Sequence, residues 1–330
     1  MAKGEFLLER MEILSEELFD SHRAEMDLVE QFQSRFATAL GWHYLLDLAW
    51  IIREIRTSLP PGSLLLDAGA GNGILQFLLA ELGYNVISAD FTGRGLPGEN
   101  LRRYRGMVHS LNSQKSSLDN RYTRHLASVY GRGGGCAPAW LARLFCKTGQ
   151  SRGSLEAVDR FRFLPRENVQ PIPFEGDPAA SCGRIFLYRC DLKEMPLIPD
   201  GFADAVVSLS ALEHNDHPGF ASCMDELLRV TKRGGKLVIT VSASQSQDWF
   251  HEPSKGWCYS EETLRKLCRL PEGVASNYPR KEELLDRLRR EGCELHKRLA
   301  PVYFESGDNG MPWGKWDPRY QPVGVVKIRP

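Results

Sequence analysis

One stretch decides the fold of this 330-residue chain, and it reads Ser63-Leu64-Leu65-Leu66-Asp67-Ala68-Gly69-Ala70-Gly71-Asn72-Gly73. Its short apolar start predicts a buried strand, and the pattern that follows predicts a helix over residues 74–82. Glycines at alternate positions let the backbone turn sharply and approach a ligand closely, and the free N–H groups at the start of a helix favour a negatively charged group. The stretch therefore predicts a ligand-binding loop between a strand and a helix.

The spacing of the glycines argues against one common class of nucleotide-binding protein. The dinucleotide fingerprint, G-x-G-x-x-G, counted from Gly69, requires a glycine where Ile74 stands. The observed spacing is D-x-G-x-G-x-G, so an NAD-dependent dehydrogenase is disfavoured. Asp90 ends the next apolar run, 19 residues after Gly71. A carboxylate at that position can accept hydrogen bonds from the hydroxyls of a ribose.

Apolar runs alternate with helical patterns over most of the chain. This alternation predicts a doubly wound α/β fold with a seven-stranded, mostly parallel sheet that helices cover on both faces. The further expected strands are residues 85–90, 184–189, 203–209 and 236–241, with late candidates at 294–299 and 323–328. The further expected helices are residues 5–58 in several pieces, 218–230, 260–270 and 280–290.

The alternation is interrupted after Phe91, where about 90 residues replace a crossover that normally needs a few tens of residues at most. Residues 94–166 carry 14 Lys and Arg against 4 Asp and Glu, whereas the whole chain holds 42 of each and has a formal net charge of zero. A basic insertion is therefore expected on an acidic body. We predict an N-terminal helical cap over residues 1–60 and a main domain over residues 61–330, within which the insertion spans residues 94–183.

The composition is ordinary for a globular protein, with 42% hydrophobic and 25% charged residues. The start of the chain has no signal-peptide pattern, and the apolar run over residues 44–52 is too short to span a bilayer. We therefore expect a cytoplasmic protein with no membrane span. The eight cysteines form no C-x-x-C pair, which favours free thiols over a zinc site.

The motif D-x-G-x-G-x-G resembles the first motif of the class I S-adenosylmethionine (SAM)-dependent methyltransferases, and the likeness covers roughly residues 60–93 and 184–270. Asp90 matches the acidic ribose ligand of that family, and Asp191-Leu192 matches its adenine-contacting motif after the third strand. Two longer stretches look like the family's lead into the fourth strand and its helix, turn and fifth strand; they are Pro199–Ser208 and Glu226–Ile239.

The resemblance implies a Rossmann-like methyltransferase domain over residues 61–330, and it implies SAM as the cofactor. It places Gly69 and Gly71 against the methionine portion, Asp90 on the ribose, and Phe91 and Asp191 at the adenine. Asp67 would orient the loop and reach the ammonium group of SAM. The full set of expected cofactor-binding residues is Asp67, Gly69, Ala70, Gly71, Gly73, Asp90, Phe91, Asp191, Leu192 and Ser210.

Methyl transfer from a sulfonium chiefly needs alignment of the acceptor, so there is no obligatory catalytic motif to find. The segment after the fourth predicted strand offers His214 and His217 as candidate general bases. Alternatively, Glu213 and His214 cap the following helix and shape the wall of the site. RNA-end 2′-O-methyltransferases that bind a divalent metal carry E-x-x-E-H here. Ser210 stands in place of their first glutamate, so we expect no metal.

Two segments leave the expected ligand-binding edge of the sheet, namely the basic insertion and an aromatic loop over residues 301–320. We expect them to bind the methyl acceptor together with part of the N-terminal cap. The expected acceptor-binding residues are Trp42, Tyr44, Arg102, Arg103, Trp313 and Trp316. Two alternatives remain open. The arginines could instead face solvent or pair with the acidic body, and the aromatic rings could instead pin the loop to the domain.

The leading hypothesis is methyl transfer to a small-molecule or glycan acceptor, with anionic or sugar-containing acceptors of the natural-product or surface-polysaccharide type favoured. One alternative is an RNA methyltransferase that uses the basic insertion, although no recognised nucleic-acid-binding module occurs and nucleic acid is not the expected partner. Another is a non-catalytic SAM-binding protein, against which the intact glycine loop argues. The sequence leaves open the acceptor, the atom methylated and the oligomeric state.

Overall fold

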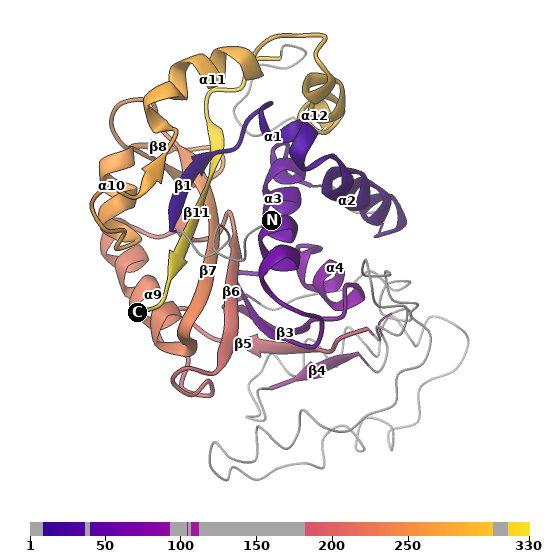
Figure 1. Cartoon of the computed structure of the whole chain (residues 1–330), viewed down its shortest axis with the longest axis vertical. Helices are drawn as coiled ribbons and strands as arrows, with labels where there is room; N and C mark the ends of the chain where they lie inside the picture. The colour runs from indigo at the N-terminus through magenta and orange to yellow at the C-terminus, as the bar shows by residue number, and fades with distance from the viewer. Residues whose placement is uncertain (1–8, 37–39, 93–103, 105–106, 112–181, 306–315) are drawn as a thin grey trace.

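The computed structural model describes residues 9–36, 40–92, 104, 107–111, 182–305 and 316–330. These residues form one sheet of eleven strands in the order β10-β1-β11-β7-β6-β2-β3-β5-β4, with β9 paired to β7 and β8 paired to β9 (Figure 1). The strands are β1 (Arg10–Ile13), β2 (Leu64–Ala68), β3 (Asn85–Asp90), β4 (Val108–Ser110), β5 (Ile185–Arg189), β6 (Ala203–Leu209), β7 (Thr231–Ala243), β8 (Trp249–His251), β9 (Gly256–Tyr259), β10 (Ala275–Ser276) and β11 (Gln321–Ile328).

The middle of the sheet has the predicted doubly wound arrangement. Strand β2 pairs in parallel with both β3 and β6, and the sheet continues in parallel through β5 on one side and β7 on the other. The chain thus starts in the centre and winds outward in both directions. The fold class is confirmed, with eleven strands in place of the expected seven.

Next to the short edge strand β10, the sheet is built from β1 and β11, which lie near opposite ends of the chain, and here the helix predicted over the first residues was wrong. Strand β11 runs antiparallel to β7, and the N-terminal β1 runs antiparallel to β11. In β1, the buried Met11 and Ile13 alternate with more exposed neighbours. Only four residues show this two-residue period, and Met11, Leu14 and Leu18 also fit a helical face. The partner strand comes from the other end of the chain, so local pattern could not reveal it.

The strand expected over residues 294–299 was also wrong, because helix α12 spans Glu294–Glu305. Its large buried side chains include Leu295, Leu299 and Tyr303, which recur every four residues and share one helical face. The period is visible only when the window extends beyond residue 299.

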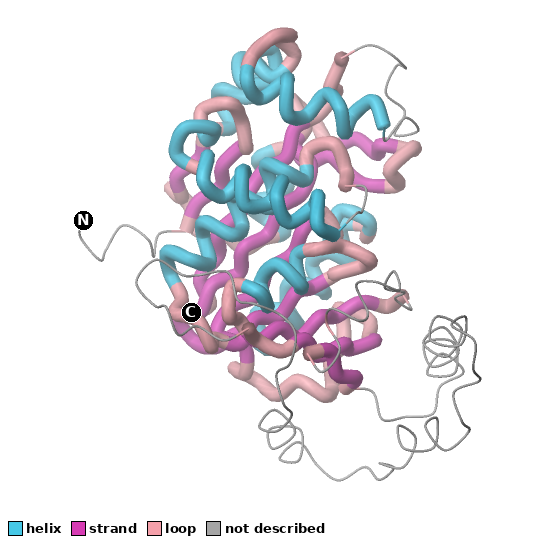
Figure 2. The backbone as a smooth tube through the Cα atoms, turned by 90° about the vertical axis from the view of Figure 1, so that its right-hand side faces the viewer, coloured by secondary structure: helices cyan, strands magenta, loops and turns pink. Residues whose placement is uncertain are grey.

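Helices cover both faces of the sheet, as Figures 1 and 2 show from two directions. The helices are α1 (Leu18–Ser21), α2 (Arg23–Phe36), α3 (Tyr44–Ser58), α4 (Leu75–Glu81), α9 (His217–Val230), α10 (Glu261–Leu267), α11 (Lys281–Leu288) and α12, with single 3-10 turns η2 (Leu212–His214) and η3 (Tyr278–Arg280). Adjacent residues of one strand face different cores. In β6, Val207 packs in the core of α2, α3 and α4, while Val206 packs in the core of α9 and α10.

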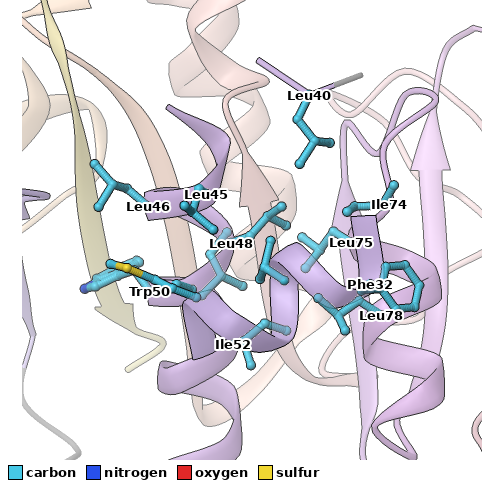
Figure 3. Close-up of a cluster of buried hydrophobic side chains, with 14 of the residues drawn as sticks. Phe32, Leu40, Leu45, Leu46, Leu48, Trp50, Ile52, Ile74, Leu75 and Leu78 are labelled. Atoms are coloured by element: carbon cyan, nitrogen blue, oxygen red, sulfur yellow. The ribbon is translucent and has the colours of Figure 1, made fainter. Parts of the chain in front are cut away.

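Helix α3 fills the centre of the first core. Phe32 of α2 and the first turns of α4 lie on one side of this helix, and its Leu46 and Trp50 point to the other side, toward β11 (Figure 3). Trp50 lies against the sheet at Gly324 of β11, where an added Cβ would come within 2.5 Å of its ring. The glycine therefore lets α3 approach the sheet closely.

Part of the predicted insertion belongs to the sheet. Strand β4 pairs in parallel with β5, and the buried Tyr104 hydroxyl donates to Glu81 of α4 at 2.6 Å. The rest of residues 94–183 lies almost entirely outside the described residues, so the proposed division into cap, domain and insertion stays a prediction. Within the described part of the chain, no helix has the length and apolarity to cross a membrane. Four of the cysteines described there are free thiols, as expected, namely Cys223, Cys258, Cys268 and Cys293.

Candidate functional site

The glycine loop after β2 has the geometry that its sequence predicts. Gly69 and Gly71 have φ angles of 77° and 46°, a backbone conformation that residues other than glycine rarely adopt. A Cβ on Gly69 would lie 2.3 Å from the Cβ of Ala211, so this glycine lets the loop contact the segment after β6. Among the described residues, a Cβ on Gly71 would meet only the Asp90 carboxylate, at 4.0 Å. Gly71 therefore lines open space beside Asp90.

Asp90 lies at the end of β3 and ties the glycine loop to it. Its Oδ2 accepts the Gly71 N–H at 2.8 Å, and its Oδ1 accepts the N–H and the hydroxyl of Thr92 at 2.7 and 2.6 Å. A carboxylate oxygen can accept about two hydrogen bonds, so Oδ2 retains room for one more donor. Phe91 follows with 72% of its surface exposed, beside a carboxylate that is only 6% exposed. An acceptor and an open aromatic face thus lie next to each other.

Asp191 and Leu192, the two residues predicted to contact the adenine after the third strand, lie in different surroundings. Leu192 reaches the glycine loop, with its Cδ1 3.7 Å from the Cβ position of Gly69. Asp191 is exposed, and its carboxylate accepts the Lys193 N–H at 2.9 Å and lies 3.5 Å from the Lys193 ammonium. The structure therefore brings Leu192 to the loop and leaves the Asp191 carboxylate at the surface.

The segment after β6 is held in an uncommon backbone conformation. Ser210 has a φ of 43°, although it is not glycine, and its N–H donates to the Thr240 carbonyl of β7 at 3.0 Å. Such a conformation costs about 1–3 kcal/mol and occurs most often where function demands it. The turn carries Ala211 onto Gly69 and directs Glu213 of η2 inward.

Glu213 is a buried carboxyl group at the strand ends, with only 4% of its surface exposed. Burial raises the pKa of Glu213 to about 8, against smaller opposing effects from its own N–H, from His43 and from the Ser210 hydroxyl. A group that exchanges its proton near neutral pH suits acid–base chemistry. Gly256 of β9 packs against Glu213, because a Cβ added to this glycine would lie 3.2 Å from the Glu213 Cγ.

The N-terminal end of α3 faces Glu213 with polar and aromatic groups. The buried His43 Nδ1 lies 2.5 Å from Oδ2 of Asp47, which is fully buried. The Tyr44 ring contacts His43, and burial together with the charges of Glu213 and Asp47 raises the pKa of the Tyr44 phenol. Tyr320, just before β11, packs against His43 as well.

We call one group of side chains the polar cluster; its members are His43, Tyr44, Asp47, Glu213, His251 and Tyr320. His251 joins it through ring contact with Tyr320. Three of its buried polar atoms have no hydrogen-bond partner among the described residues, namely Asp47 Oδ1, Glu213 Oε2 and His251 Nε2. A buried polar atom without a partner costs about 1–3 kcal/mol, so three of them together indicate a place that a polar ligand or water completes.

The two histidines predicted as bases lie outside the polar cluster. His214 is exposed, and its Nδ1 lies 2.9 Å from the Lys255 carbonyl. The His217 Nε2 lies 2.8 Å from Oδ2 of Asp248, whose Oδ1 accepts the Ser260 N–H at 2.7 Å. The alternative cap is formed by neither Glu213 nor His214, because Asp216 caps α9 by accepting the Gly219 N–H.

Of the predicted acceptor-binding residues, only Tyr44 belongs to the polar cluster. Trp42 and Trp316 are 1% and 4% exposed and meet edge to face. The Trp42 indole donates to Tyr320, and the Trp316 indole donates to the Leu288 carbonyl. These contacts agree with the alternative in which the aromatic rings pin the loop to the domain. The remaining predicted residues lie outside the described residues; they are Arg102, Arg103 and Trp313.

Sequence reasoning missed the burial of Glu213 and the His43–Asp47 pair. The spacing of His43 and Asp47, four residues apart on one helical face, could have suggested their pairing. Nothing local could have placed them opposite Glu213, which belongs to a distant part of the chain. In the described part of the chain, no group of three or more His, Cys, Asp and Glu side chains could hold a metal ion.

Comparison with known proteins gives one family match. The family model described as "Methyltransferase domain" matches residues 130–239, which include β5, β6 and the first part of β7. The match does not include the glycine loop, so the two observations come from separate parts of the chain. No curated protein matches the chain.

Solved structures similar to this chain share little of its sequence. The [4+2]-cyclase SpnF is 16% identical over 88% of this chain and 84% of that chain, with a TM-score of 0.41. The N-methyltransferase 2 of Haemonchus contortus, solved with phosphomonomethylethanolamine and S-adenosylhomocysteine, is 15% identical over 95% and 59%, with a TM-score of 0.42. Geranyl diphosphate C-methyltransferase from Streptomyces coelicolor is 14% identical over 94% and 80%, with a TM-score of 0.35. Likenesses this low carry no information on the ligand of this chain.

Proposed function

Because the chain belongs to the class I superfamily of SAM-dependent methyltransferases, we propose that it methylates a small-molecule or glycan acceptor that binds against the polar cluster. The observation that carries this proposal is the set of three buried polar atoms without described partners at the strand ends, on Asp47, Glu213 and His251. Glu213 lies two residues after Ala211, which contacts Gly69 of the glycine loop. An acceptor there would be adjacent to the cofactor.

The residues of the glycine loop fit SAM. Gly69 and Gly71 leave space where a side chain would stand, and Asp90 retains acceptor capacity on Oδ2 beside the exposed Phe91 ring. We propose that Asp90 holds the ribose, that Phe91 packs on the adenine, and that Asp67, Ala70, Gly73, Leu192 and Ser210 complete the site. The exposed Asp191 would have to give up its contacts with Lys193 to bind the adenine amino group. SAM supplies an electrophilic methyl group on a positively charged sulfur.

We further propose Glu213 as the residue that takes a proton from the acceptor. It is buried in the segment that contacts the glycine loop, and its pKa of about 8 is near neutral pH. His214 points its Nδ1 at a backbone carbonyl, and His217 is paired with Asp248, so both are less well placed for this role. The His43–Asp47 pair would orient the acceptor, and the rings of Tyr44 and Tyr320 would exclude water from it.

Acceptor profiling tests the proposal. The chain is incubated with methyl-labelled SAM and a fractionated cell extract, and the label is followed in small molecules, glycans and RNA. We expect label in the small-molecule or glycan fraction, and none with the Gly71→Val variant, whose side chain fills the space beside Asp90. Gly71→Ala is the matched control for the backbone strain at this φ. Label confined to RNA would identify the alternative activity, and binding of SAM without any transfer would identify a non-catalytic protein.

A further inference from the structure

We infer that the binding of SAM to this enzyme expels the proton of Glu213 into solvent, and that the binding of the product S-adenosylhomocysteine (SAH) does not. The inference rests on the proposed function, because it places the sulfur of SAM beside the glycine loop. It concerns a different property, however, since it predicts a proton that is counted in a binding experiment without any acceptor present.

Glu213 lies close to the place that the cofactor would occupy. Gly69 of the glycine loop is in contact with Ala211, two residues before Glu213, so the carboxyl group belongs to the segment that packs on the cofactor loop. Its surface is 4% exposed, and Gly256 closes its other side. A charge at the loop would therefore act on Glu213 through the protein interior, where electrostatic interactions are much stronger than in water.

The groups that face Glu213 come from four elements of the fold. From α3 and its start these are His43, Tyr44 and Asp47; from the β6 turn, Ser210; from β9, Cys258 and Tyr259; and from the segment before β11, Tyr320. Among these described neighbours there is no lysine or arginine, and the imidazole of His43 is engaged by Asp47. With no fixed cation to offset burial, the pKa of Glu213 is raised to about 8.

The two ligands differ in the charge that they bring. SAM carries a sulfonium cation, whereas the sulfur of SAH is neutral, and both share the adenosine and amino-acid parts. A cation within a few ångströms lowers the pKa of a carboxyl group by about 1–3 units. For a shift of about 2 units at neutral pH, Glu213 would change from about nine-tenths protonated to about one-tenth protonated, which releases about 0.8 of a proton. Neutral SAH provides no such force.

The release of the Glu213 proton on SAM binding is consistent with the charge balance of the transfer reaction. The Glu213 carboxylate accepts the proton of the acceptor hydroxyl or amine as the bond from that atom to the methyl group forms. The sulfur–methyl bond breaks and its electron pair returns to sulfur. Glu213 thus ends protonated beside a neutral thioether, which is the protonation state of the free enzyme. The carboxylate becomes the main form of Glu213 when SAM binds, so the cofactor generates the base that the transfer needs.

Titration calorimetry at about pH 7 tests the inference, with SAM and SAH each injected into the whole chain in buffers that differ in ionisation enthalpy. The slope of the observed enthalpy against the buffer enthalpy counts the protons exchanged. We expect about 0.8 proton released with SAM and close to none with SAH. Independently, the affinity for SAM should rise by up to about 10-fold per pH unit between about pH 6 and pH 8, while the affinity for SAH changes little.

The Glu213→Gln variant assigns the proton. Glutamine has the size of the glutamate side chain and is neutral, as Glu213 mostly is in the free enzyme, so we expect this variant to bind SAM without proton release. The control variant Glu252→Gln changes an exposed residue and should behave as the wild type. Equal proton release with SAM and SAH, no release with either ligand, or unchanged release in folded Glu213→Gln would overturn the inference. If Glu213→Gln does not fold, the difference between SAM and SAH in the wild type still decides. Proton release without transfer to any small acceptor would contradict the proposed function and leave this inference intact.

Discussion

Replacing Glu213 by glutamine should stabilise the free enzyme, by an amount that grows with pH. The pKa of Glu213 is raised from 4.5 to about 8 by burial. Each unit corresponds to about 1.4 kcal/mol, so the ionised carboxylate is about 5 kcal/mol less favourable in the folded chain than in the unfolded chain. Glutamine fills the same space and carries no charge at any pH, so the variant escapes this cost.

The direction of the pH dependence follows from the raised pKa. Below about pH 4.5 the group is protonated in both folded and unfolded chains, and its stabilising contribution is fully present. As the pH rises, the unfolded chain loses the proton first, and the contribution is lost progressively until the pH passes the folded value of about 8. The free energy of unfolding of the variant should therefore exceed that of the wild type by about 1.4 kcal/mol more for each pH unit within this window.

Urea denaturation without ligand, followed at about pH 5, 6, 7 and 8, measures this difference. The two curves of unfolding free energy should separate by about 4 kcal/mol over that range. Glu252→Gln is the control, because that side chain is exposed and its removal should leave the pH dependence of the wild type unchanged. Parallel curves for wild type and Glu213→Gln would refute the conclusion that burial holds this carboxyl group protonated.

Three further predictions concern the loop and the insertion. Asp90→Ala should weaken SAM binding by about 5- to 150-fold, because the ribose loses its acceptor at a cost of about 1–3 kcal/mol; calorimetry that finds full affinity in a folded variant excludes Asp90 from the site. Gly69→Ala should lower the melting temperature of the free enzyme, since its Cβ would lie 2.3 Å from Ala211, and an unchanged melting temperature in differential scanning calorimetry would mean that this contact is relieved easily. Charge reversal at Arg102 and Arg103 should raise the KM for an anionic acceptor, in a salt-dependent way, and spare the SAM dissociation constant; loss of SAM binding instead would make the insertion part of the cofactor site.

The parts of the fold with a strong local signal could be predicted from the sequence. The strand over residues 203–209 has the predicted bounds, and the helix after the glycine loop differs by one residue at each end. Both have a run long enough for their period to be unambiguous. The glycine loop was predictable for another reason, since positive φ at Gly69 and Gly71 is a requirement that few residue types meet.

The parts that depend on distant pairing could not be predicted. Strand β1 owes its conformation to β11, and its four residues fit a helix as well as a strand. The same limit applies to the site: Glu213 is buried by residues that are distant in the sequence, among them those of α3, β9 and the segment before β11. Tertiary burial, not local pattern, raises the pKa of Glu213, and so the sequence alone did not single this residue out.

A crystal structure with SAH would show whether the cofactor reaches from Asp90 to the polar cluster, on which the proposed function depends. We expect ribose hydroxyls within hydrogen-bonding distance of the Asp90 carboxylate, and the sulfur facing the side of the glycine loop on which Glu213, Tyr44 and Tyr320 lie. A ribose held elsewhere, or a sulfur separated from Glu213 by the sheet or by packed side chains, would contradict the proposal, since the polar cluster could then not receive the methyl acceptor.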